Sequence, residues 1–293
     1  MVRVSVFDFM KYRFLTIFAS LALLAAGVGG YVFHGGFRYS VDFVGGTQLL
    51  VKFSKPVGSE VLKGALIASG FGDAVTREFS NVDAIIRVKE FSNDVKGLGN
   101  AIKDGLEKNL DTTLVEILEI NAVGPATGAA LRFNFIVMMV LALILMLAYI
   151  AFRFWSFSYG VGAVVALLHD ALCILAVFAL LHKEISPNFI CAIIATLGYS
   201  INDTIVIFAR IRETFAKEKN KNGFEVVNES LSNTMKRTLL TSLSTALVVG
   251  SLFVFGGESL TNLSLALLVG IIVGTYSSIF IASPIMLALR RTL

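Results

Sequence analysis

The sequence predicts an α-helical membrane protein: six transmembrane helices, with a small α+β, ferredoxin-like domain between the first and the second. The 293 residues are 56% hydrophobic and only 16% charged, whereas soluble domains average roughly 45–50% apolar and 25% charged residues. Six apolar runs are long enough to cross a bilayer as helices. Charged residues return over one stretch, 35–128, where the apolar runs are short. No Arg-rich face with interleaved aromatic residues is present, so nucleic acid is not expected as a partner.

The first apolar run covers residues 14–33 and follows the basic residues Arg3, Lys11 and Arg13. A basic start before an apolar run is also typical of a cleaved secretory signal peptide. This run is long for a signal peptide and further spans follow it, which favours an uncleaved anchor. Residues 1–34 are therefore predicted to form the N-terminus and the first span.

Residues 35–128 are predicted to form a small domain outside the bilayer. Apolar residues at intervals of three and four mark a helical face at Val95, Leu98, Ile102 and Leu106. The predicted strands are 48–53, 74–79, 84–88 and 114–120, and the predicted helices are 59–68 and 94–109. The order β-α-β-β-α-β is that of the split βαβ motif, which predicts a ferredoxin-like fold.

Residues 129–293 are predicted to form a bundle of closely spaced spans. The apolar runs are 131–152, 156–181, 188–209, 238–255 and 260–289. The last run is longer than about 25 residues, so we expect it to be tilted, kinked near Pro284 or continued beyond the bilayer. The longest loop expected in this part is 210–236.

The placement of Lys and Arg predicts the orientation, because cytoplasmic segments carry an excess of these residues. If the N-terminus is cytoplasmic, thirteen of them fall inside, against Lys183 alone in the short outside loops. The thirteen are Arg3, Lys11, Arg13, Arg153, Arg210, Arg212, Lys217, Lys219, Lys221, Lys236, Arg237, Arg290 and Arg291. Both termini and the loop 210–236 are therefore expected in the cytoplasm, and 35–128 outside.

Four polar residues interrupt the apolar run 188–209: Ser200, Asn202, Asp203 and Thr204. A charged residue at the bilayer centre costs about 2.5–3.5 kcal/mol on insertion scales, so an intramembrane Asp marks a functional site by default. The alternative is a structural carboxylate with a fixed partner. We expect the chemistry of this protein to depend on Asp203.

Arg237, at the start of the fifth span, is the candidate partner of Asp203. The fourth and fifth spans are joined by a cytoplasmic loop, so they can lie antiparallel with both residues near the same depth. The alternative is an interfacial arginine that extends toward water. A carboxyl group binds a proton more readily when buried and less readily beside a guanidinium. Movement of Arg237 would therefore switch Asp203 between binding and releasing a proton.

Threonines surround Arg237 on one face of the fifth span, at helical spacing. They are Thr234, Thr238, Thr241 and Thr245. If this hydroxyl face lies against the polar cluster of the fourth span, it could hold water. The polar residues of both spans are expected to face the bundle or a partner subunit, because exposing them to hydrocarbon is costly.

His169-Asp170, near the middle of the third span, is a second intramembrane ionisable pair. Histidine can relay protons near neutral pH, but we favour the alternative, a structural role in polar contacts between helices. Cys173 and Cys191 both fall in apolar runs and predict no disulfide framework. The sequence has no metal-ligand cluster, Walker-type loop, His-Glu-x-x-His motif or nucleophile elbow, so no metal, cofactor or enzymatic activity is expected.

Two glycine-containing segments flank the outside domain. The first reads Asp42-Phe43-Val44-Gly45-Gly46-Thr47, and its paired glycines permit a sharp turn or a close backbone approach. The second reads Val123-Gly124-Pro125. Gly45, Gly46, Gly124 and Pro125 are candidate hinge positions, although a turn signal alone has low specificity.

In their order along the chain, these segments resemble the SecF proteins of the SecD/SecF family of protein-export membrane proteins. The matching segments are 9–13, 41–47, 123–125, 166–170, 198–212 and 237–242. The resemblance covers nearly the whole chain. Its most specific part is Ser200-Ile201-Asn202-Asp203-Thr204, followed by Arg210-Ile211-Arg212-Glu213.

The resemblance implies an RND-like half transporter with six spans and one periplasmic domain, in the bacterial cytoplasmic (inner) membrane. It implies that proton motive force is used, together with SecD, to help unfolded secreted proteins leave the SecYEG translocon, with YajC as a further partner. By its position in the motif, Asp203 resembles the family's proton-carrying acid, and Arg237 resembles the arginine that partners it. A second essential acid resides in SecD.

Two other classes of function remain open. One is a half-size RND-like exporter of lipids or small molecules, which a large apolar cleft in the outside domain would favour. The other is a structural assembly subunit without proton coupling, which full activity of an Asp203→Asn variant would favour.

Overall fold

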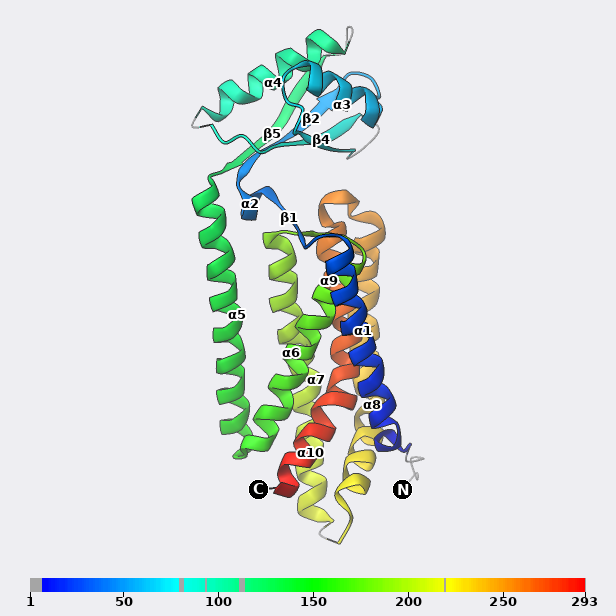
Figure 1. Cartoon of the computed structure of the whole chain (residues 1–293). Coiled ribbons are helices and arrows are strands. Elements are labelled where there is room, and N and C mark those ends of the chain that lie inside the picture. Colours follow the sequence, from blue (N-terminus) through cyan, green and yellow to red (C-terminus); the bar gives the residue numbers. More distant parts are fainter. Residues whose placement is uncertain (1–6, 79–81, 93, 111–113, 219, 293) are drawn as a thin grey trace. The chain divides into compact units, whose positions relative to one another are not determined.

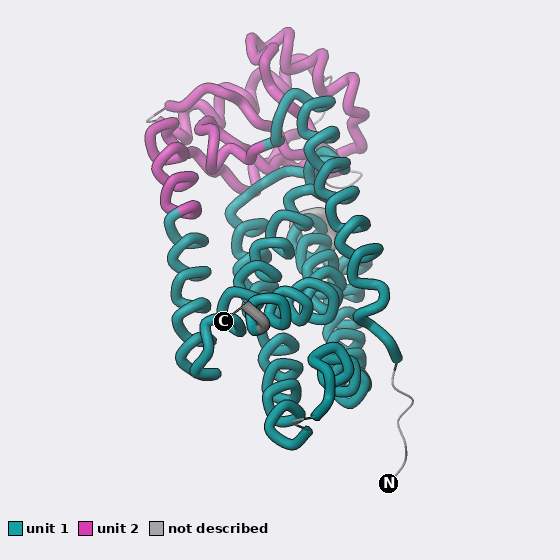
Figure 2. The backbone as a smooth tube through the Cα atoms, turned by 60° about the horizontal axis from the view of Figure 1, so that its bottom comes forward, with its two compact units in different colours: residues 1–38, 137–293 teal, residues 39–136 magenta. Residues whose placement is uncertain are grey.

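The computed structural model describes residues 7–78, 82–92, 94–110, 114–218 and 220–292 (Figure 1). The chain divides into two compact units (Figure 2). The bundle unit comprises residues 1–38 and 137–293, and the sheet unit comprises residues 39–136. Each unit is described by itself below.

Long helices build the bundle unit (Figure 1). They are α1 (Arg13–Phe33), α5 (Pro125–Phe154, which begins in the sheet unit), α6 (Phe157–Leu180), α7 (Pro187–Lys217), α8 (Gly223–Phe255) and α9 (Gly257–Ser277). Shorter elements are η1 (Phe9–Tyr12), β1 (Arg38–Tyr39), β6 (Glu184–Ile185), η2 (Ser278–Ala282) and α10 (Ser283–Thr292). Six helical segments of the described chain are long and apolar enough to cross a membrane, which confirms the six predicted spans.

The segment 210–236 differs from its prediction, because it is mostly helical rather than a loop. Helices α7 and α8 extend into it and leave only residues 218–222 between them. Charged side chains one turn apart stabilise the end of α7, where Arg210 contacts Glu213 at 2.9 Å. Asn222 caps the start of α8 in a reciprocal capping box. Hydropathy identifies only the apolar, membrane-crossing part of such helices, so it does not predict their polar extensions.

Close packing of α1 against α6 depends on glycine. At Gly27 a Cβ atom would overlap the Ala176 side chain, and at Gly30 it would lie 3.0 Å from the Cα of Leu180. Small residues at such contacts let helix backbones approach closely, which is the usual source of helix association in a bilayer.

The last span contains a π-helical turn, η2, between α9 and α10. This turn ends two residues before Pro284, near which the sequence predicts a kink; proline lacks the N–H that an α-helix requires. The Ser283 hydroxyl donates to the carbonyl oxygen of Ser278 at 3.0 Å. π turns are rare overall, and those that occur are often found at functional sites. In this one, Ser278 is buried in the interior of the bundle.

Four antiparallel strands form the sheet of the sheet unit. They are β2 (Gly46–Phe53), β3 (Val75–Glu78), β4 (Asp83–Val88) and β5 (Val115–Val123), in the order β3-β4-β2-β5. The helices are α3 (Ser59–Ala68) and α4 (Val95–Asn109). Residue pairs across the sheet include Leu49 with Ile86 and Leu49 with Ile120. This topology is consistent with the predicted ferredoxin-like fold.

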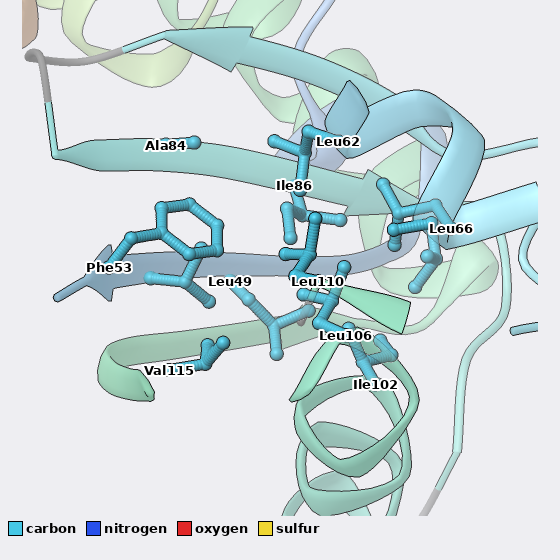
Figure 3. Close-up of a cluster of buried hydrophobic side chains, with 13 residues drawn as sticks. Leu49, Phe53, Leu62, Leu66, Ala84, Ile86, Ile102, Leu106, Leu110 and Val115 are labelled. Carbon is cyan, nitrogen blue, oxygen red and sulfur yellow. The ribbon is translucent and has the colours of Figure 1, made fainter. Parts of the chain in front are cut away.

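Alternate residues of the central strand form the core of the sheet unit (Figure 3). Leu49, Val51 and Phe53 of β2 are buried and meet side chains from both helices, as the period of two in a strand requires. The members contributed by the helices are Leu62, Ala65, Leu66, Ile102 and Leu106. The helical face predicted at 94–109 is therefore confirmed by the burial of Ile102 and Leu106.

The two glycine-containing segments lie against each other within the sheet unit. The short helix α2 (Val41–Val44) ends at Gly45, whose φ of 87° favours glycine. A Cβ at Gly45 would lie 2.7 Å from the Cα of Pro125. Gly46 also has a positive φ, 129°, and pairs with Val123 at the end of β5.

Side chains of the first segment are also ordered in the sheet unit. Ser40 donates a 3.0 Å hydrogen bond to Asp42. Phe43 is buried and packs edge-on against Phe135, with ring centroids 5.4 Å apart. Gly124 follows β5 directly. The hinge role of these segments stays a prediction.

Candidate functional site

Helix α7 positions the central residues of the candidate site. Pro187 occupies its first turn, and the Ser186 side chain accepts a hydrogen bond from the backbone N–H of Phe189, so the helix start is well defined. Asp203 is 4% exposed and Thr204 1% exposed. The predicted polar cluster of α7 therefore faces mostly into the bundle.

A hydroxyl of α8 contacts the Asp203 carboxyl, and this hydroxyl is bonded in turn to a hydroxyl of α9. Ser242 of α8 donates a hydrogen bond to Asp203 Oδ2 at 3.3 Å. Ser242 in turn shares a 2.7 Å hydrogen bond with Thr275 of α9. The carboxyl therefore lies where three helices meet, and its partner on α8 is a neutral group.

Asp170 of α6 forms a second buried carboxyl site. Its partner on α7 is Ser200, which lies about one helical turn before Asp203. Ser200 donates to Asp170 Oδ2 at 2.6 Å. His169 Nδ1 lies 3.4 Å from Asp170 Oδ1, and His169 Nε2 lies 3.4 Å from the Cys173 sulfur. Asp170 is 1% exposed, so these contacts supply its polar environment inside the bundle.

The π turn connects the α7 cluster to the last span. Thr204 and Ser278 share a 2.8 Å hydrogen bond, and Ser278 also approaches the Ser200 carbonyl oxygen at 3.4 Å. These contacts attach the π turn to α7 beside Ser200, whose hydroxyl bonds Asp170, and at Thr204, which directly follows Asp203.

Arg237 lies on α8, the helix that meets Asp203, but its side chain is exposed on the bundle unit. The ion pairs formed by the described residues do not join Arg237 to Asp203. Asn202 is also exposed. The structure thus brings Asp203, Thr204 and Ser200 inward and leaves Asn202 and Arg237 on the surface of this chain.

The predicted threonine face of α8 is divided in the structure. Thr234 and Thr238 are buried, whereas Thr241 is exposed and donates to backbone carbonyl oxygens of its own helix. Thr245 is half-buried and donates to the Tyr199 hydroxyl of α7 at 3.1 Å. The buried line of hydroxyl groups therefore turns away from Arg237.

Three contributors were not among the predicted site residues: Ser242, Thr275 and Ser278. Ser242 follows Thr238 by four residues, so helical spacing could have placed it on the buried face. Thr275 and Ser278 lie in an apolar run with small residues, where sequence alone has no signal for which hydroxyl faces a carboxyl. Their assignment requires the packing of α9 and η2 against α7.

The arrangement is suited to holding and moving a proton. A carboxyl group with neutral hydroxyl partners can be accommodated in its protonated form inside the bundle, because each hydroxyl both donates and accepts hydrogen bonds. Intramembrane Asp residues of this kind are characteristic of proton relays in pumps and transporters.

The fold and the site define a class: a multispanning membrane protein whose helix bundle encloses ionisable groups and whose chain carries an α+β domain outside the spans. The family model for the C-terminal region of protein export membrane proteins SecD/SecF matches residues 103–292, and the SecD/SecF GG motif matches residues 30–57. The chain belongs to the SecD/SecF family of protein-export membrane proteins.

Its relatives include protein translocase subunit SecF of several bacteria. The one from Rhodothermus marinus is 39% identical, over 87% of this chain and 84% of the relative. The one from Pseudomonas aeruginosa is 34% identical, over 99% of this chain and 94% of the relative.

Among solved structures, the translocon-associated membrane protein SecDF of Thermus thermophilus superimposes with a TM-score of 0.86 and 34% identity, over 99% of this chain. This chain spans 40% of the length of that solved chain.

Proposed function

We propose that this chain is the SecF-type subunit of a complex that assists protein export, working with SecD at the SecYEG translocon and using proton motive force. Its substrate is an unfolded secreted protein, and it has no enzymatic activity or cofactor of its own. The observation that carries this proposal is the buried Asp203 carboxyl, which meets hydroxyl groups of α8 and, through Ser242, of α9. Family membership supplies the context of protein export.

Asp203 is the proton carrier in this proposal, and the Arg237 guanidinium changes position when Asp203 gains or loses its proton. One proton that crosses 100 mV yields about 2.3 kcal/mol, and such an energy biases a conformational equilibrium substantially. Because Arg237 is not in contact with Asp203 in this conformation, the proposed cycle includes a second state in which the guanidinium approaches the deprotonated carboxylate.

A partner subunit covers the exposed polar residues of α7 and α8 in the complex. Asn202 and Arg237 are exposed within helices that cross the membrane, and polar groups facing hydrocarbon are costly. A SecD-type subunit fits this surface, since this chain spans only 40% of the solved SecDF chain, which leaves more than half of that chain for a further part. YajC is a further proposed partner.

The proposed location is the bacterial cytoplasmic (inner) membrane, with both termini in the cytoplasm and the segment 35–128 outside. The excess of Lys and Arg in the segments assigned to the inside supports this orientation. On this assignment, the connection between α7 and α8 faces the cytoplasm.

The decisive test is Asp203→Asn in vesicles that contain the complete complex with SecD and SecYEG. Asn is nearly isosteric with Asp but cannot carry a proton, so the stimulation of export by an imposed pH gradient is expected to disappear while co-purification with SecD persists. Asp104→Asn, an exposed carboxylate of α4, is the matched control and should behave as wild type. Full gradient-dependent stimulation in the Asp203→Asn complex would show that this acid is structural.

A further inference from the structure

Helices α7 and α8 pack antiparallel in one constant register, marked by hydrogen bonds between their side chains. The joined pairs are Thr214 with Ser230 at 3.0 Å, Asp203 with Ser242 at 3.3 Å and Tyr199 with Thr245 at 3.1 Å. In each pair the two residue numbers add to 444 or 445. The register therefore also identifies the neighbours of α8 residues that form no such bond.

The Thr238 hydroxyl forms no such bond. Its position places it opposite Val206 or Ile207 of α7, which offer no polar side-chain group. Thr238 is 1% exposed, and its hydroxyl is among the buried side-chain polar atoms of the described residues that have no hydrogen-bond partner. Leaving a buried hydroxyl without a hydrogen-bond partner is unfavourable, so a partner for this group is favoured.

The unpartnered hydroxyl interrupts an otherwise regular line of polar groups along α8. Ser230, Thr234, Thr238 and Ser242 follow one another at intervals of four residues, and all four are buried. The line begins near the α7–α8 connection, where Ser230 bonds to Thr214, and it ends at Asp203. Thr238 is its second-last member before the carboxyl.

We propose that Thr238 binds a water molecule that conducts protons between Asp203 and the end of the bundle formed by the α7–α8 connection. This inference rests on the proposed function of Asp203 as a proton carrier. Successive hydroxyls along the line are about 6 Å apart, since four residues rise 1.5 Å each. Two hydrogen bonds of about 2.8 Å span that distance, so one water per gap completes the chain.

Every hydroxyl on this path stays uncharged while a proton passes along it. As Asp203 releases a proton to Ser242, the serine passes its own proton to the bound water. The water protonates Thr238 Oγ1 as that hydroxyl releases its proton toward Thr234. Each hydroxyl thus gains one proton and loses one; Asp203 becomes a carboxylate, and the proton leaves Ser230 to solvent water at the α7–α8 end of the bundle.

The charged and titratable groups around this path come from both helices that line it. Asp203 and Arg210 lie on α7, and Arg237 directly precedes Thr238 on α8. From α9 the Thr275 hydroxyl contacts Ser242.

The test uses Thr238→Val, which keeps the shape of the side chain and removes the hydroxyl, in vesicles that hold the complete complex. Proton uptake driven by an imposed gradient is expected to slow by roughly tenfold or more, since positioned proton-transfer groups contribute on the order of a hundredfold in rate. Thr238→Ser should restore the wild-type rate. Ser244→Ala, on the exposed side of α8 with its hydroxyl bonded to its own helix, should leave the rate unchanged.

A second measurement separates conduction from structure. Hydrogen–deuterium exchange of the Asp203 carboxyl, followed by its infrared band, should slow in Thr238→Val and recover in Thr238→Ser, while co-purification with SecD stays at the wild-type level. Unchanged proton uptake and carboxyl exchange in Thr238→Val would overturn this inference. If instead wild type and Asp203→Asn take up protons equally, the proposed function itself has failed.

Discussion

Ser242 donates a 3.3 Å hydrogen bond to Asp203 Oδ2, whereas Arg237, on the same helix, points to the surface of the bundle unit. Residues five apart on an α-helix differ by about 140° in direction, so the two side chains cannot face the carboxyl together. The conformation seen here is therefore the one in which Asp203 has a neutral partner on α8. An Asp203–Arg237 ion pair requires α8 to rotate or to slide.

Ser242→Ala removes the direct partner of Asp203 and its link to Thr275. We expect a loss of about 0.6–2 kcal/mol in the free energy of unfolding, the range for polar contacts between membrane helices. Gradient-stimulated export should fall less than in Asp203→Asn, because the proton carrier remains. Unfolding in SDS and export in vesicles measure the two effects, with Ser244→Ala as the control. A loss of export equal to that of Asp203→Asn would contradict this ranking.

Ser200→Ala leaves the buried Asp170 without its 2.6 Å hydrogen bond. The cost of an unsatisfied buried group is about 1–3 kcal/mol, and larger when the group is charged. We expect the α6–α7 contact to weaken and the complex to unfold at lower SDS concentration. Replacing the carboxyl as well, in the double variant Ser200→Ala with Asp170→Leu, should recover part of the loss. A double variant less stable than the sum of its single changes would argue against this pairing.

The sequence predicted most of the architecture and less of the site. The six spans follow from hydropathy alone, and α3 begins and ends where the spacing predicted. Asp203 was identified because a carboxyl within an apolar run is costly. Its partner was not, because depth along a helix can be counted in residues while rotation about the helix axis depends on packing. Arg237 lies near the expected depth along α8, whereas Ser242 lies on the side of α8 that faces the Asp203 carboxyl.

Gly27→Ala should separate α1 from α6. A Cβ at this position overlaps Ala176, and forcing extra volume into a packed contact typically costs about 1–3 kcal/mol. Gly29→Ala is the matched control on the same helix, because no atom lies within 4 Å of a Cβ built there. Disulfide cross-linking between cysteines introduced on α1 and α6 should slow only in the Gly27 variant. Equal rates in both variants would mean that this contact is not close-packed in the membrane.

Gly45→Ala should strain the start of β2. Its φ of 87° is unfavourable for alanine, and the new Cβ would lie 2.7 Å from the Pro125 backbone. Such backbone strain costs about 1–3 kcal/mol. Hydrogen exchange of the β2 amides in the full chain should accelerate. Gly64→Ala, within α3 and with no atom within 4 Å, should instead be neutral or stabilise by up to about 1 kcal/mol. Faster β2 exchange in the Gly64 variant would point to a general loss of the fold.

Hydroxyl groups recur every four residues along α8. Two alignments of α8 against α7 that differ by four residues therefore both place a hydroxyl beside Asp203. A slide of α8 by four residues, about 6 Å, moves each hydroxyl to the position that the next hydroxyl of the line occupied before. Thr238 then stands where Ser242 now meets Asp203, and Arg237 moves from five residues away to the residue next to the contact. Another hydroxyl, that of Thr238, replaces Ser242 at Asp203, so the guanidinium can approach the carboxylate without leaving the carboxyl unpaired, whereas Val226 replaces Ser230 opposite Thr214 at the other end of the line.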